Sequence, residues 1–394
     1  MKRLKHNFKK GMAFVLSLAM VAGLVPAMSG GANKVQAAPG SGTELSVSAY
    51  ATKEQLMTAF TPDSNGDATT IGKLVFGKNS SGTAQEWYIL GKDTGISVDD
   101  NTIIFAASPI ATGQKFSSSR SDKPFDSSFG VYENYDPITV KPNHYGASDL
   151  RVALQDMAAN TNYFTTAEQG LMNATTVTTN DTYNSIYYSI TYTTTDKLYA
   201  LAADGVGSST IKAGTSDSTV LAMSSYWRDS TFWLRSPLDY GSAMYTWLSA
   251  VGESWVVDEF AVQPASNLNL SSVLFASSAK AASSDTAESG TIADGTAMTL
   301  RLNGTGKDIG TVTYNTTTGD IKATKGSTSQ TVALIVQGRG TVNGEEKDWY
   351  YSKQITGTEV VNVTDIVSET TTPASIDLST CKIWLETTDS TENL

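Results

Sequence analysis

Aromatic and acidic side chains gather between residues 238 and 260, and these residue types suit ligand binding. The aromatic members are Tyr240, Tyr245, Trp247, Trp255 and Phe260, and the acids are Asp239, Glu253, Asp258 and Glu259. Aromatic faces stack on sugar rings or pack against a protein partner, and carboxylates accept hydrogen bonds from hydroxyl or amide groups. The segment therefore predicts a surface for an extracellular glycan or protein ligand. The expected ligand-binding residues are Tyr240, Tyr245, Trp247, Trp255 and Asp258.

Strand alternation limits how many of these rings can face solvent. In a strand over residues 243–248, Tyr245 and Trp247 share one face, whereas Met244 and Thr246 share the other. We expect Tyr245 and Trp247 to point outward. The alternative is that about half of the rings in the segment belong to the hydrophobic core.

Arg235 precedes the aromatic segment in the run Trp233-Leu234-Arg235-Ser236-Pro237. Its guanidinium could bind a ligand carboxylate, or it could be buried and donate hydrogen bonds to backbone carbonyls. We favour the buried role for Arg235, and we expect Trp233 to belong to the core.

The usual parts of catalytic and metal sites are missing from the sequence. After residue 37 the chain holds one histidine, His144, and it has no Gly-x-Ser-x-Gly motif. Neither a histidine-rich metal site nor a typical serine hydrolase triad can be built, so His144 is expected to be a loop residue. The segment 63–67 (DSNGD) begins like a calcium loop, but Ala68 and Leu74 stand where glycine and a bidentate glutamate are needed, which favours a solvated turn.

We therefore expect no catalytic residue, no metal and no cofactor, and we do not expect an enzyme. Two alternatives stay open. Acids are plentiful in this chain, so a pair of carboxylates could hydrolyse a glycan. A structural protein of the cell envelope, with the aromatic segment packed on a sister subunit, is the other.

The first 37 residues predict a cleavable secretory signal peptide. Five basic residues precede residue 11, and an apolar run from Met12 to Pro26 follows, shorter than the ~20 residues that span a bilayer. Cleavage is expected after Ala37. The remaining chain carries 22 basic and 39 acidic side chains, a net charge of −17, which repels nucleic acid and anionic lipid. We expect a secreted or extracellular protein, without membrane insertion after cleavage; attachment to the cell surface and the oligomeric state are left open.

Composition divides the rest of the chain into two expected domains. Residues 277–291 are mostly small and polar, as in a linker, and separate residues 38–276 from residues 292–394. The later domain has alternating runs at 298–302, 311–314, 331–336 and 360–363, which predict an all-β sandwich of immunoglobulin type. Its expected core residues are Val312, Leu334, Val336, Trp349 and Trp384. Cys381, the single cysteine, cannot form an internal disulfide.

The earlier domain is expected to be α+β, with short helices and irregular antiparallel strands. Helices are predicted after the capping boxes at Thr52 and Thr165 and after Ser148 as N-cap. Strands are predicted at 73–76, 86–90, 102–106, 187–192 and 254–257.

Two runs of the earlier domain resemble a family of exported bacterial proteins of unassigned function. That family carries W-L-R-S-P, a variable stretch and then G-V-R-P-A-x-N-L, and this chain has WLRSP at 233–237 and FAVQPASNLNL at 260–270. Further matches are WYIL at 87–90, the S-x-L-R-x-x-L pattern at 148–154 and the D-K-hydrophobic pattern at 196–201, so the resemblance covers about residues 70–276. Two positions depart from the pattern: Gln263 stands in place of arginine, and Ala261 in place of glycine.

The family is similar in layout to the C-type-lectin-like fold of formylglycine-generating, sulfatase-modifying enzymes and of retroelement-diversified receptors. This resemblance implies that the strands at 233–237 and 262–265 form the core, while residues 238–259 display the binding surface. The formylglycine-generating reaction needs active-site cysteines, and Cys381 lies in the other domain, so that activity is not implied.

Overall fold

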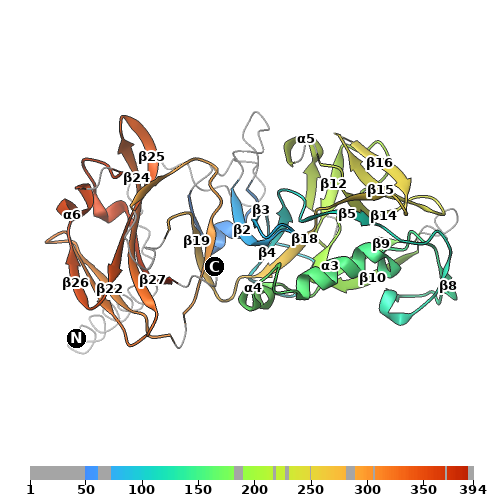
Figure 1. Cartoon of the computed structure of the whole chain (residues 1–394), viewed down its shortest axis with the longest axis horizontal. Helices are drawn as coiled ribbons and strands as arrows, with labels where there is room; N and C mark the ends of the chain where they lie inside the picture. Colours follow the sequence, from blue (N-terminus) through green and yellow to red (C-terminus); the bar gives the residue numbers. More distant parts are fainter. Residues whose placement is uncertain are drawn as a thin grey trace, which may run out of the picture. The chain divides into compact units, whose positions relative to one another are not determined.

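The computed structural model (Figure 1) describes residues 49–60, 72–181, 190–215, 219–226, 230–248, 250–280, 289–304, 307–368 and 371–388. The chain is mostly β, with 48% strand and 12% helix, and it forms many small antiparallel sheets and a few short helices. The expected signal peptide at 1–37 and the calcium-loop-like segment at 63–67 lie outside the described residues. No helix in the described ranges has the length and apolarity that crossing a bilayer requires.

The chain divides into two compact units. The larger contains the described parts of Val35–Ser277 and Gly295–Asn303, and the smaller contains those of Ser278–Asp294 and Gly304–Thr391. This differs from the expected boundary. β21 (Thr299–Leu302) pairs with β19 (Val273–Ser277) of the larger unit, whereas β20 (Gly290–Ile292), in the expected linker, pairs with β25 (Glu345–Ile355) of the smaller unit. Alternation predicts a strand, but it does not say which sheet edge that strand completes.

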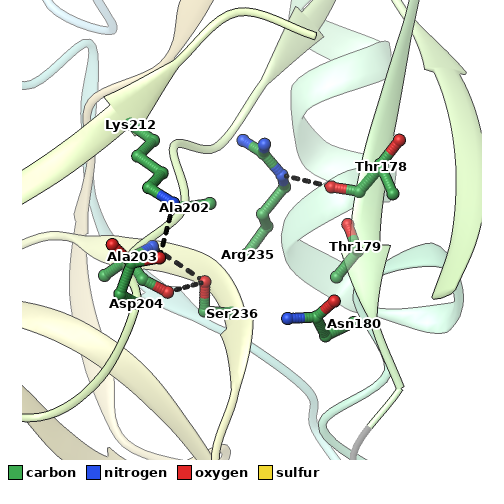
Figure 2. Close-up of a pocket in the computed structure, with 9 residues that line it drawn as sticks. All are labelled: Thr178, Thr179, Asn180, Ala202, Ala203, Asp204, Lys212, Arg235 and Ser236. Carbon is green, nitrogen blue, oxygen red and sulfur yellow. Dashed lines mark hydrogen bonds and ion pairs between the residues drawn. The ribbon is translucent and has the colours of Figure 1, made fainter. Parts of the chain in front are cut away.

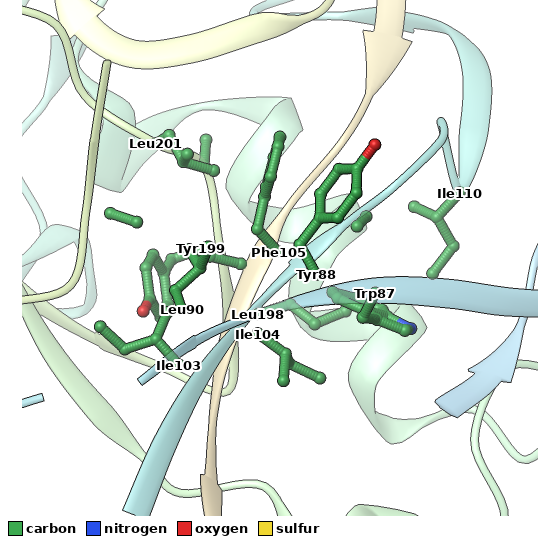
Figure 3. Close-up of a cluster of buried hydrophobic side chains, with 14 of the residues drawn as sticks. Trp87, Tyr88, Leu90, Ile103, Ile104, Phe105, Ile110, Leu198, Tyr199 and Leu201 are labelled. Atoms are coloured by element: carbon green, nitrogen blue, oxygen red, sulfur yellow. The ribbon is translucent and has the colours of Figure 1, made fainter. Parts of the chain in front are cut away.

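A five-stranded antiparallel sheet forms the centre of the larger unit. Its order is β11 (Leu198–Tyr199), β18 (Ala265–Asn269), β4 (Asn101–Ala106), β3 (Ala84–Gly91) and β2 (Lys73–Lys78). Every residue of β4 is buried, so both faces of this strand are covered. Figure 3 shows the cluster that results, with Trp87 and Tyr88 of β3, Phe105 of β4 and Tyr199 of β11. The Trp87 indole donates to the carbonyl of Phe76 at 2.6 Å, which satisfies its one polar atom.

Smaller sheets surround this centre. They are β1 (Tyr50–Thr52) with β19 and β21; β7 (Val131–Tyr132) with β10 (Thr191–Asp196) and β9 (Thr175–Asn180); β12 (Thr210–Ala213) with β13 (Thr219–Ala222); β14 (Trp233–Pro237) with β15 (Ser242–Trp247) and β16 (Ala250–Trp255); β17 (Glu259–Val262) with β5 (Ala111–Lys115); and β6 (Lys123–Pro124) with β8 (Thr139–Val140). The strands expected at 73–76, 86–90 and 102–106 are confirmed. The one expected at 187–192 is described only from residue 190, and the one expected at 254–257 ends at Trp255 because a turn follows.

The helices are short and begin where the caps predict. The larger unit has α2 (Lys53–Leu56), α3 (Asp149–Ala159), α4 (Thr166–Leu171) and α5 (Met223–Tyr226), with 3-10 turns η2 (Ser127–Phe129) and η3 (Tyr145–Ala147). Both capping boxes are formed, Thr52 with Gln55 and Thr165 with Glu168, and the Ser148 hydroxyl accepts from the backbone N–H of Arg151.

Two antiparallel sheets build the smaller unit. One has the order β20, β25, β24 (Thr331–Val342) and β27 (Lys382–Thr388), and the other the order β22 (Gly310–Asn315), β23 (Asp320–Lys325) and β26 (Thr358–Val361). Leu334, Val336 and Trp349 join Ile321 and Val361 in one buried cluster, so both sheets contribute to the same core. Trp384 is buried as expected, but Val312 is only partly buried.

One expected strand of the smaller unit is interrupted by a cap. β26 ends at Val361, and α6 (Val363–Val367) follows, where the sequence predicts a strand over 360–363. Asn362 and Asp365 form a capping box, which satisfies the backbone donors of a first helical turn despite the β-branched residues around it. A further 3-10 turn, η5, spans Leu378–Thr380.

Candidate ligand-binding site

Exposed aromatic side chains are confined to one segment of the part that the structure describes. These are Tyr240, Trp247 and Trp255, which are 56%, 58% and 49% exposed. All lie on the turn between β14 and β15 or on the β15–β16 hairpin. The aromatic surface of the described residues therefore coincides with the segment that the sequence singles out.

The hairpin does not bring these three rings together. Trp255 is paired with Ser242 at the base of the hairpin, whereas Trp247 is paired with Ala250 at its tip. The register also places Trp247 and Trp255 on opposite faces, and a rise of ~3.4 Å per residue separates the two ends by about 17 Å. Trp247 shares the exposed tip with Leu248, and a ligand held beside Trp255 does not need to reach it.

Five side chains form what we call the Tyr240–Trp255 surface: Arg120, Asp122, Lys141, Tyr240 and Trp255. The Tyr240 hydroxyl donates to Oδ1 of Asp122 at 2.8 Å, and Nζ of Lys141 donates to Oδ2 at 2.8 Å. Nζ of Lys141 also lies 4.3 Å from the centroid of the Tyr240 ring. Cζ of Arg120 lies 3.6 Å from the centroid of the Trp255 ring. Each exposed ring of this surface therefore has a cation on it.

The turn that carries Tyr240 is held from two sides. The Asn143 side chain donates to the carbonyls of Asp239 and Ser242, and the N–H of Val256 donates to the carbonyl of Gly241 at 3.0 Å. A Cβ at residue 241 would lie 3.3 Å from the Trp255 ring, so glycine lets the indole pack closely on the turn. The turn that carries Tyr240 is thus held against the strand that carries Trp255.

Hydrogen bonding sets the charge of this surface. Partial burial alone would raise the pKa of Asp122, but hydrogen bonds from Lys141 and Tyr240 hold it below its usual value. The pKa of Tyr240 is raised, mainly by its hydrogen bond to Asp122. Asp122 is therefore ionised and Tyr240 protonated near neutral pH. In the hydrogen bond between them, Tyr240 is the donor and Asp122 the acceptor.

Tyr245 corrects the expected orientation of the strand. It is half-buried, and its ring stacks on Phe260 of β17 at 4.4 Å between centroids and 13° between planes. Gly252 also lies against the Tyr245 ring: a Cβ at this position would be 3.0 Å from it. The expectation that Tyr245 points outward is wrong, because β17 packs over this part of the hairpin; Trp247, on the same face at the tip, is exposed as expected.

Asp258 closes the turn that follows β16. Its carboxylate accepts a hydrogen bond from the Ser254 hydroxyl, and its N–H donates to the carbonyl of Trp255 at 2.9 Å. The expected ligand-binding residue Asp258 thus has a structural partner and is half-buried. Its role in binding stays a prediction.

No family model, curated protein or solved structure matches this chain. The resemblance to the exported bacterial family therefore rests on the quoted motifs. Two of these motifs contact each other: Nε of Arg151, in the S-x-L-R-x-x-L pattern, lies 2.8 Å from Oδ1 of Asp196, in the D-K pattern.

Arg235 is buried, as favoured from the sequence, and fully so. Its Nη1 donates to the carbonyl of Ala200 at 2.7 Å, and its Nε donates to that of Thr178 at 3.3 Å. Figure 2 shows Arg235 between the 178–180 segment of β9 and the 202–204 segment. The polar pocket there has a volume of about 60 Å³, enough for a few water molecules but not for a sugar ring. Trp233 is also buried, as expected.

His144 lies in a loop, as expected, where it is the N-cap of η3, but it is buried. It is 3% exposed and stacks on Tyr192 at 3.9 Å between centroids. Its Nδ1 accepts from the N–H of Ala147, and its Nε2 lies 2.9 Å from the Tyr132 hydroxyl, which donates to Asp181. Burial, and then the positive charges of Arg151 and Lys123, lower the pKa of His144 from 6.5 to about 3. Ala147 is only three residues away, but the stacking partner Tyr192 is 48 residues away, so nothing in the sequence indicated this packing.

Within the described ranges, no group of three or more His, Cys, Asp or Glu side chains is arranged to hold a metal ion. Cys381 is partly buried, and burial raises the pKa of its thiol to about 12, so it stays in the unreactive thiol form. The side chains of the Tyr240–Trp255 surface offer stacking, hydrogen bonding and charge.

Proposed function

We propose that this chain is a secreted or cell-surface binding protein that recognises a glycan through the Tyr240–Trp255 surface. The observation that carries the proposal is the confinement of exposed aromatic rings, among the described residues, to residues 240–255. Sugar rings present C–H faces to aromatic side chains and hydroxyls to fixed polar groups, and this surface offers both.

The charge state of Asp122 supports binding over hydrolysis. A glycosidase needs one carboxyl group with a raised pKa to protonate the leaving oxygen. Both oxygens of Asp122 accept hydrogen bonds, and its pKa is lowered. This carboxylate suits a fixed acceptor for a sugar hydroxyl.

We also infer a C-type-lectin-like fold for the larger unit and an immunoglobulin-like sandwich for the smaller. In support, the WLRSP run forms the buried strand β14, the PASNL run leads into β18 of the central sheet, and the exposed aromatics lie between them. An experimental structure whose strand order differs from those folds would contradict the inference.

Export through the signal peptide is part of the same proposal. The protein recovered from culture medium is expected to begin at Ala38, which N-terminal sequencing would establish. Recovery only from the cytosol, with Met1 retained, would contradict it.

Replacing Trp255 by Ala is expected to weaken glycan binding at least tenfold, because a central buried ring contact typically carries more than ~1.4 kcal/mol. The measurement is isothermal titration with oligosaccharides identified on a glycan array. The matched control is Trp247→Ala, which replaces a tryptophan of similar exposure at the other end of the same hairpin. For a short oligosaccharide it is expected to bind as the wild type does. The proposal would be contradicted if no glycan on the array bound the protein, or if both variants bound with the affinity of the wild type.

A further inference from the structure

The guanidinium of Arg120 lies over the Trp255 ring, and its distance from the ring fits a stacked arrangement. Its guanidinium carbon is 3.6 Å from the ring centroid, close to the van der Waals separation of two stacked planes. An upright guanidinium at that distance would push a nitrogen into the ring. The N–H groups of guanidinium lie in its own plane, so stacking leaves them directed outward along the surface.

In the part of the chain that the structure describes, no carboxylate lies within 4.0 Å of Arg120. By contrast, Arg151 pairs with Asp196 and Arg339 pairs with Asp348. Arg120 is exposed, and no hydrogen bond joins it to another described residue. Its donors are therefore available to a ligand.

The remaining charges of the Tyr240–Trp255 surface are already used. Lys141 and Tyr240 each donate to Asp122, and one oxygen of Asp122 is bound by each. Arg120 is thus the cation of this surface whose charge no described acid balances. A planar guanidinium that is held in place by stacking fits a carboxylate with two parallel hydrogen bonds.

We propose that the Arg120–Trp255 stack binds the carboxylate of an acidic sugar, so that the ligand is a glycan containing uronic acid. The inference rests on the proposed function and names its ligand class. Arg120 holds the carboxylate, the exposed part of the Trp255 indole packs on the sugar ring, and Asp122 and Tyr240 face its hydroxyls. The chain as a whole repels polyanions, so such binding depends on this local contact.

The test uses uronic-acid oligosaccharides, each paired with its methyl ester, which keeps the sugar and removes the charge. By isothermal titration, the wild type is expected to bind the acids at least tenfold more tightly than the esters. Arg120→Gln is expected to bring the ratio of acid affinity to ester affinity close to one. Arg120→Lys is expected to restore only part of the preference, because lysine lacks the planar fork. The matched control is Lys92→Gln, which removes one exposed positive charge from another part of the same unit.

Equal affinity for acids and esters would overturn the inference, as would an unchanged preference in Arg120→Gln. If neutral sugars bind and Trp255→Ala loses them, the proposed function stands while this inference fails. If no saccharide binds, both fail. Tighter binding of poly-glutamate than of any uronic-acid oligosaccharide would assign the carboxylate to a protein ligand and overturn the sugar part.

Discussion

Replacing Arg151 by Met is expected to destabilise the larger unit by about 3–5 kcal/mol, because it leaves a buried carboxylate without its counter-ion. The Asp196 side chain has no exposed surface and lies 2.8 Å from Nε of Arg151. Nη1 of Arg151 also donates to the carbonyls of Ser128 and Gly146, at 2.9 and 3.2 Å. Methionine keeps much of the side-chain volume but none of these bonds, so the loss is mainly electrostatic.

The size of this loss is expected to grow with pH. Burial raises the pKa of Asp196 despite the opposing charge of Arg151 and a hydrogen bond from Thr194. Without Arg151 that pKa rises further. A carboxyl group with a raised folded-state pKa holds its proton in the fold, so its contribution to stability is lost as pH rises through that pKa. Arg151→Met is therefore expected to be milder at pH 5 than at pH 8.

The measurement must separate the two units, because a chain with two compact units does not unfold in one step. Urea unfolding followed by pulsed hydrogen exchange and mass spectrometry reads peptides from 175–199 alone. Adding Asp196→Asn to Arg151→Met removes the orphaned charge and is expected to recover part of the stability. A loss under about 1 kcal/mol, or one independent of pH, would contradict the argument.

Local signals in the sequence predicted local structure well. Thr52, Ser148 and Thr165 cap helices as expected, because a cap and its partner lie within one turn of chain. The burial of Trp233 and Arg235 also follows from a short run of residues. The helices after these caps are short, 4 to 11 residues, as predicted, and the chain as a whole is mostly β.

Contacts between distant segments could not be predicted in the same way. Tyr245 is turned inward by Phe260, which lies on another sheet. The Tyr240–Trp255 surface needs Arg120, Asp122 and Lys141, which precede it by about a hundred residues. Alternation and composition describe one strand at a time, so they found the aromatic half of the surface and missed its cations.

Acid is expected to destabilise the larger unit through His144. Because Nδ1 accepts from the Ala147 N–H, the proton sits on Nε2 and is donated to Tyr132, whose own proton goes to Asp181. A second proton on Nδ1 would point at the Ala147 N–H, so two donors would face each other and the hydrogen bond would be lost. The fold therefore keeps His144 neutral and lowers its pKa from 6.5 to about 3.

Folding stability changes with pH here because the folded and unfolded states bind different numbers of protons at His144. Between pH 6.5 and 3 the unfolded chain protonates this histidine and the folded chain does not, so stability falls as pH falls through that window. At pH 4 the loss is about 3 kcal/mol relative to pH 7. His144→Gln removes the titrating group, so its unfolding free energy, read from peptides of 131–199 as above, is expected to vary less between pH 7 and pH 4.

Other carboxyl groups also titrate in this range, so the difference in pH dependence between wild type and His144→Gln is the diagnostic quantity. Equal dependence in the two proteins would contradict the assignment. The two predictions are also coupled. Among the charges around His144, Arg151 lowers its pKa most, so Arg151→Met is expected to raise that pKa. The variant is then expected to lose less stability than the wild type between pH 7 and pH 4, and more between pH 5 and pH 8. If Arg151→Met increased the pH dependence of stability in both ranges, or decreased it in both, the arginine would act on this unit by some means other than its charge.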